Sequence, residues 1–170
     1  MQTKTLRLYN LGFTQIKTYL FALAFVLGNI LLPQLCHLMP QGGLIFLPIY
    51  FFTLIASYKY GLKVGLMTAV LSPVVNYLLF AMPSSAVLGS ILVKSIFLAV
   101  AASLVASRSG KLSVYTLALV VLSYQLFGTA VEWIMVGDFG LAIQDFRIGI
   151  AGMLLQIVGG YLFIKHLIYK

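Results

Sequence analysis

Residues 86–111, AVLGSILVKSIFLAVAASLVASRSGK, show the pattern that decides the fold. The segment from 86 to 106 is apolar apart from small polar residues and Lys94, and Arg108 and Lys111 follow it. About 20 apolar residues suffice to cross a bilayer, and Lys and Arg collect in loops that stay on the cytoplasmic side. This stretch therefore predicts a membrane-spanning helix whose C-terminal end faces the cytoplasm.

The same pattern recurs along the whole chain of 170 residues, which is 62% hydrophobic and 8% charged. A soluble domain typically has about 25% charged residues, so a water-soluble fold is excluded. We predict six spans, at residues 17–36, 44–58, 64–81, 86–106, 112–136 and 146–166. The second is the least regular, because it is short and contains Pro48. Residues 17–170 are expected to form a single all-α transmembrane domain, preceded by a short cytoplasmic or interfacial segment at 1–16.

The positions of the basic residues predict the orientation. Nine of the eleven Lys and Arg residues lie on one side of the predicted membrane: Lys4, Arg7, Lys17, Lys59, Lys63, Arg108, Lys111, Lys165 and Lys170. With six spans, this places both termini in the cytoplasm. The net charge of +8 is explained by topology and attraction to anionic lipid, and not by nucleic acid, because the cations sit singly or in pairs at span ends.

Polar residues inside the predicted spans mark a candidate binding site. A charge within a span costs at least about 2.5–3.5 kcal/mol, so such a residue usually faces the bundle interior or a wet cavity. The candidates lie in the outer parts of spans 3 to 6 or in the last outer loop: Asn76, Lys94, Gln125, Glu132, Trp133, Asp145, Arg147 and Gln156. Helical spacing places Gln125, Thr129 and Glu132 on one stripe of the fifth span.

This set of side chains suggests a small-molecule site with charges of both signs. Lys94 and Arg147 would contact an anionic or carbonyl group of the solute. Glu132 would meet an amine or a ring N–H, and Trp133 would stack on a ring. The competing interpretation is structural, with Lys94 and Glu132 paired to each other and the amide side chains forming hydrogen bonds between helices. The sequence leaves both interpretations open.

Neither enzymatic nor cofactor chemistry is predicted. The chain contains no HExxH or GxSxG motif and no glycine-rich phosphate loop. Cys36 and His37 are adjacent, but no third or fourth ligand accompanies them, so no metal site is predicted. If the chain moves a solute against a gradient, the energy has to come from a partner protein or from an ion.

Several short motifs together resemble one family of membrane proteins. They are HLMPQGG at 37–43, LPI at 47–49, YGLKVG at 60–65, LSP at 71–73 and FAMP at 80–83. With the layout of six spans and the polar residues in the outer half, they resemble the S components of energy-coupling-factor (ECF) vitamin transporters, which are substrate-binding subunits.

The resemblance implies a function, a location and partners. An S component in the bacterial cytoplasmic membrane captures a small vitamin-like solute from outside, with the loop between spans 1 and 2 as a lid. A transmembrane coupling subunit and two cytoplasmic ATPase subunits then drive uptake. In the family, an Ala-xxx-Ala surface on span 1 docks the coupling subunit. Its nearest match here is Ala24 and Gly28, with Ala22 as a further small residue.

Two alternative functions stay open beside the importer subunit. One is a structural or assembly protein of the membrane that binds no ligand. The other is a stand-alone, ion-coupled carrier. The identity of the solute does not follow from the sequence.

Overall fold

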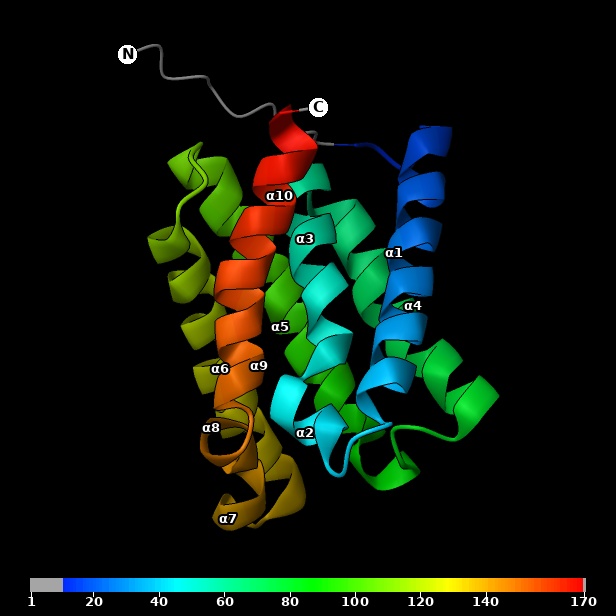
Figure 1. Cartoon of the computed structure of the whole chain (residues 1–170), viewed down its shortest axis with the longest axis vertical. Coiled ribbons are helices and arrows are strands. Elements are labelled where there is room, and N and C mark those ends of the chain that lie inside the picture. The colour runs from blue at the N-terminus through cyan, green and yellow to red at the C-terminus, as the bar shows by residue number, and fades with distance from the viewer. Residues whose placement is uncertain (1–10, 170) are drawn as a thin grey trace.

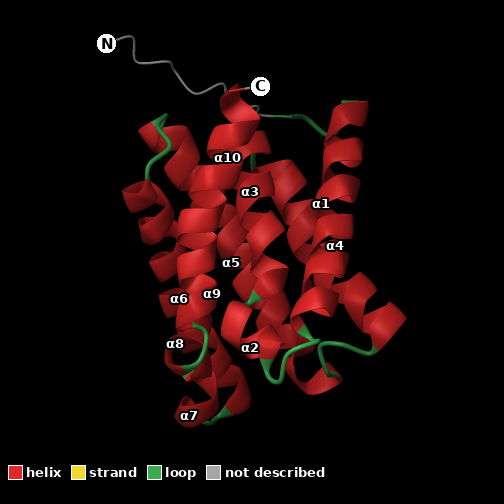
Figure 2. Cartoon of the chain, in the orientation of Figure 1, coloured by secondary structure: helices red, strands yellow, loops and turns green. Residues whose placement is uncertain are grey.

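The computed structural model describes residues 11–169, with side chains described as far as residue 167, and all regular structure in this part is helical (Figures 1 and 2). Five segments are long and apolar enough to cross a membrane. They are α1 (Ile16–Cys36), α4 (Leu62–Phe80), α5 (Ser85–Ser109), α6 (Val114–Val136) and the segment Ile150–Leu167. This agrees with the predicted all-α, multi-pass membrane architecture.

The predicted second span at 44–58 is broken into short pieces. These are α2 (Gly42–Phe46), the 3₁₀-helix η1 (Pro48–Tyr50) and α3 (Phe51–Tyr60). The break lies at Leu47, which has left-handed backbone angles (φ 46°, ψ 47°), and the following proline has no N–H to continue a helix. Nearly every residue of α3 is buried, so α3 contacts other helices rather than lipid. Five helices are therefore long and apolar enough to span a membrane by themselves. The broken segment Gly42–Tyr60 also runs from the end that contains α2 to the end where α4 begins (Figure 1), and the predicted count of six spans stays a prediction.

The C-terminal part of the chain is also less regular than predicted. After α6, two single-turn helices follow, α7 (Phe139–Ala142) and α8 (Gln144–Arg147). The last span then consists of α9 (Ile150–Leu154), the π-helical segment η2 (Leu155–Gly159) and α10 (Gly160–Tyr169). It begins a turn later than the predicted start at 146, because residues 144–147 form α8 instead.

The two ends of the helix bundle differ in charge. The turn from α3 to α4 and the turn from α5 to α6 lie at the end where α1 begins and α10 ends (Figure 1). Lys59, Lys63, Arg108 and Lys111 lie in these turns or in the helix ends beside them, and we call this the basic end. The opposite end contains α2, α7 and α8 (Figure 1). These four cations therefore share one end, as the sequence pattern predicted. Lys4, Arg7 and Lys170, and most of the predicted segment 1–16, lie outside the described residues.

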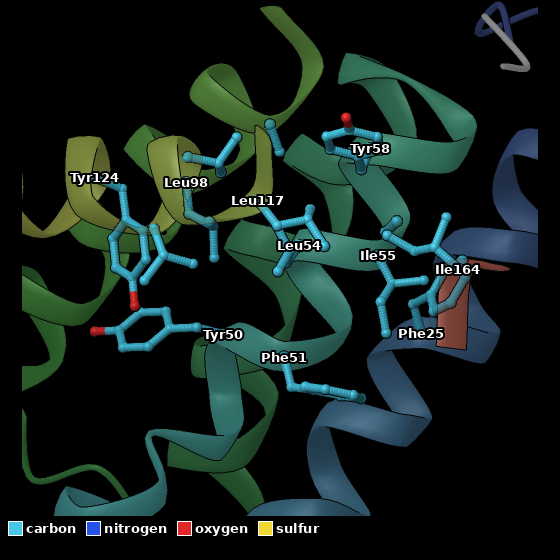
Figure 3. Close-up of a cluster of buried hydrophobic side chains, with 14 of the residues drawn as sticks. Phe25, Tyr50, Phe51, Leu54, Ile55, Tyr58, Leu98, Leu117, Tyr124 and Ile164 are labelled. Atoms are coloured by element: carbon cyan, nitrogen blue, oxygen red, sulfur yellow. The ribbon is translucent and has the colours of Figure 1, made fainter. Parts of the chain in front are cut away.

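The core is built around α3. Leu54 and Ile55 of α3 are fully buried and lie near Leu98 of α5, Leu117 of α6 and Ile164 of α10 (Figure 3). In a bilayer the lipid is as apolar as these side chains, so close packing and hydrogen bonds, rather than exclusion from water, hold such helices together. Polar side chains that face this interior therefore need partners within the bundle.

Candidate functional site

Three charged side chains meet inside the bundle near the opposite end. Lys94 Nζ lies 2.5 Å from Glu132 Oε2 and 2.7 Å from Asp145 Oδ2. The three residues are only 2%, 6% and 6% exposed, respectively. We call Lys94, Glu132 and Asp145 the charge cluster. It contains both of the acids predicted for the site, and Lys94 contacts both of them.

Three helices and one glycine build the charge cluster. Lys94 comes from the third turn of α5, Glu132 from the penultimate turn of α6 and Asp145 from α8. Gly128 lies one turn before Glu132, and a Cβ added there would come within 2.5 Å of Lys94 Cγ. The lysine stem therefore passes through space that only a glycine on α6 leaves open. Asp138 accepts a hydrogen bond from the first turn of α7, which starts the chain reversal that brings α8 back to the bundle.

The cluster holds more negative than positive charge. With all three groups ionised, two carboxylates face one ammonium and leave one net negative charge. Burying a charge without a partner is costly, and a buried pair stabilises a protein only where the geometry and the remaining hydrogen bonds are complete. The excess negative charge therefore favours binding of a cation and disfavours binding of an anion.

Two buried tyrosines and a glutamine form a second group of polar side chains. The rings of Tyr50 and Tyr124 lie 5.4 Å apart, and both side chains are buried. Tyr124 donates a hydrogen bond of 2.9 Å to Gln156 Oε1, so it joins α6 to the π-helical segment. π-helical turns occur frequently at functional sites.

Several buried polar atoms on α6 and in η2 have no hydrogen-bond partner. They are both amide atoms of Gln125, Nε2 of Gln156 and Oγ1 of Thr129. Each such atom costs about 1–3 kcal/mol when it is buried without a partner. Gln125 and Gln156 are completely buried. Unpaired donors and acceptors of this kind call for an explanation, and a polar ligand that pairs with them is one.

Two predicted site residues lie away from the cluster. Arg147 is exposed at the end of α8, whereas Lys94 is buried against two carboxylates. Trp133 is 50% exposed and packs edge-on against Phe139, with ring centroids 5.3 Å apart. Consecutive helical residues point about 100° apart. Trp133 therefore lies on a different face of α6 from Glu132, and its stacking on a ligand ring stays a prediction.

Asn76 belongs to a different network, which joins α1, α3 and α4. Its Nδ2 donates to the carbonyl oxygens of Asn29 and Ser72, at 2.9 Å each. The Asn29 carbonyl lacks its usual helical donor because Pro33, four residues later, has no N–H. Asn29 Nδ2 in turn donates to Thr53 Oγ1 at 3.0 Å and to Ser72 Oγ at 3.1 Å. The sequence analysis missed the role of Asn29, although the position of Pro33 signals a free carbonyl there.

The predicted docking face on α1 is only partly exposed. Ala22 is 1% exposed and belongs to the core. Gly28 is half-buried, and a Cβ added to it would come within 2.8 Å of the ring of Phe52. Ala24 alone of the three predicted residues is exposed. The small residues Ala22 and Gly28 therefore serve packing inside the chain, which corrects their predicted place on a partner surface.

Two cavities lie outside the charge cluster. One, of about 610 Å³, lies between α5 and α6 and extends to Arg108 near the basic end. The other, of about 350 Å³, lies between the end of α1, α2 and the start of α5, and Asn76 lines it. No member of the charge cluster lines either cavity. In residues 11–169, no three His, Cys, Asp or Glu side chains are grouped as metal ligands.

Comparison of the chain with known proteins finds no match. No protein-family model, no curated protein and no solved structure is significantly similar to it.

Proposed function

We propose that the chain is the substrate-binding subunit of a membrane importer and that it captures a small vitamin-like solute. One observation carries this proposal. The charge cluster, with its excess negative charge and its unpartnered polar neighbours, lies buried near the end opposite the basic end. If the basic end faces the cytoplasm, as the distribution of Lys and Arg favours, the cluster lies toward the outside, where a solute arrives.

The charge balance favours a solute with a cationic group. The sequence suggested that Lys94 and Arg147 would meet an anion, but Lys94 already contacts two carboxylates. A protonated amine or a cationic ring would compensate the remaining negative charge. The unpartnered amides of Gln125 and Gln156 would hydrogen-bond its polar edge. A cationic or zwitterionic heterocycle matches these groups better than an acid does.

The proposed route for energy is a partner complex. An importer subunit without its own nucleotide-binding motif depends on other subunits for ATP hydrolysis. The resemblance to S components supports a transmembrane coupling subunit and two ATPase subunits in this role. Because Ala22 and Gly28 pack internally, the coupling subunit would dock on a surface of α1 that includes Ala24 and its lipid-facing neighbours.

A structural role is the second candidate, and one observation favours it. Lys94 lies within hydrogen-bond distance of both carboxylates, as expected if the cluster only joins α5, α6 and α8. The two functions differ in their response to loss of one negative charge. A Glu132→Gln variant keeps the Lys94–Asp145 pair, so a purely structural cluster would tolerate it. A cation-binding cluster would lose its ligand.

Mass spectrometry of small molecules that copurify with the protein tests the proposal. The wild type and an Arg147→Gln control, which changes an exposed charge at the same end, are expected to retain one solute with a cationic group. Glu132→Gln is expected to lose it while keeping a normal melting temperature. Uptake by cells that lack the ATPase subunits would instead support a stand-alone, ion-coupled carrier. If the wild type and both variants carry no solute and cells show no uptake, the structural role is supported and the importer proposal fails.

A further inference from the structure

The cavity of about 350 Å³ at the opposite end is enclosed by segments that are distant in sequence. Its walls come from the last turns of α1, the loop after α1, α2, η1, α4 through Asn76, the connection from α4 to α5, and the first turns of α5. Its volume falls in the range of about 300–1,000 Å³ that is typical of small-molecule sites. Because it shares no lining residue with the charge cluster, it is a separate site.

The chemistry of the walls excludes a charged ligand. No Lys, Arg, Asp or Glu lines the cavity, and His37 at its exposed rim is the one imidazole. Most of the lining is apolar, with Leu44, Ile49 and Ile91 among the side chains. Moving an unpaired charge into such surroundings is very costly. The occupant is therefore neutral and largely apolar.

Two unpartnered atoms in the walls define the polar part of the ligand. Gln34 Nε2 is a buried donor with no acceptor, and Asn76 Oδ1 is a buried acceptor with no donor. Asn76 is 2% exposed, and its own Nδ2 is already engaged with two carbonyl oxygens. The acceptor is thus fixed in place and lacks only a donor. A ligand that offers an N–H beside a C=O would satisfy both residues.

The backbone around the cavity is held in an unusual conformation. In the part of the chain that the structure describes, the non-glycine residues with positive φ are Gln41, Leu47 and Ala81. Gln41 lines the cavity, and the other two directly precede lining residues, Pro48 and Met82. Left-handed conformations of such residues cost about 1–3 kcal/mol each and cluster at ligand sites. This supports a binding role for the same region.

We propose that this cavity binds a neutral small molecule with a cyclic amide edge, such as a lactam or a pyridone, on an apolar body. Gln34 Nε2 donates to the ligand carbonyl, and Asn76 Oδ1 accepts from the ligand N–H. This site goes beyond the proposed cation site, and either can exist without the other.

Binding of 2-quinolone to the protein in lipid nanodiscs tests the site. This probe combines a C=O and an N–H edge with an apolar ring, and 1-methyl-2-quinolone is the matched probe without the N–H. We expect 2-quinolone to bind in saturation-transfer NMR, and the methylated probe to bind about tenfold more weakly because it leaves Asn76 Oδ1 unpaired. Gln34→Leu is expected to weaken 2-quinolone about two- to tenfold. The control Gln15→Leu, at an exposed position directly before α1, is expected to leave the binding of 2-quinolone unchanged.

Filling the cavity gives a second measurement. Leu44→Trp is expected to abolish binding, whereas Leu31→Trp, on the exposed side of α1, is expected to leave it intact. If Leu44→Trp does not fold, Ile91→Phe takes its place. The proposal is overturned if 2-quinolone does not bind, if both probes bind equally, or if the filled variants bind as the wild type does. It is also overturned if a phospholipid chain occupies the cavity and the probe does not displace it.

Discussion

Replacing Lys94 by methionine is the most severe test of the charge cluster. The substitution keeps an apolar stem beside Gly128 and removes the ammonium that lies 2.5 Å from Glu132 and 2.7 Å from Asp145. Two buried carboxylates then lack their cation. Breaking a buried ion pair by removing one partner costs roughly 3–5 kcal/mol.

We therefore expect Lys94→Met to lower the free energy of unfolding by about 3–5 kcal/mol, measured by titration with sodium dodecyl sulfate in mixed micelles. The triple variant Lys94→Met/Glu132→Gln/Asp145→Asn is expected to recover most of this loss, because it buries no charge. Arg147→Met removes an exposed cation at the same end and is expected to change stability by less than about 0.5 kcal/mol. If Lys94→Met is as stable as the wild type, the reasoning is refuted. It is also refuted if the triple variant is no more stable than Lys94→Met.

Two further predictions concern packing and hydrogen bonding. Gly128→Leu places side-chain atoms where the Lys94 stem lies, since even a Cβ would come within 2.5 Å of Lys94 Cγ. Thermal unfolding should show that the free energy of unfolding falls by about 1–3 kcal/mol. An unchanged melting temperature would contradict this geometry. Asn76→Leu leaves the carbonyl of Asn29 without a donor and should cost about 1–3 kcal/mol. Adding Pro33→Ala restores an N–H four residues after that carbonyl, so the double variant should be more stable than Asn76→Leu alone, and failure of this rescue would argue against the assigned hydrogen bond.

The positions of most spans follow from hydropathy alone. The helices α1, α4, α5 and α6 lie within a few residues of the predicted spans, because length and apolarity decide whether a helix crosses a bilayer. Hydropathy could not predict that the segment 44–58 is broken and lies inside the bundle. Hydropathy does not distinguish side chains that face lipid from those that face other helices, and α3 is apolar because it lies in the core.

The candidate site was predictable where helical spacing decides it. Gln125, Thr129 and Glu132 share one buried face of α6, as their spacing indicates. The placement of Asp145 beside Lys94 was not predictable, because it depends on the path of α7 and α8 between the spans.

The most direct measurement is an experimental structure of the protein purified with its copurifying solute still bound. We predict density that belongs neither to protein nor to lipid, within about 3 Å of a carboxylate oxygen of Glu132 or Asp145. The cationic group of the solute should lie at that contact. If both carboxylates contact Lys94 alone and neighbouring side chains fill the surrounding space with and without solute, the cluster is a structural joint and the importer proposal fails.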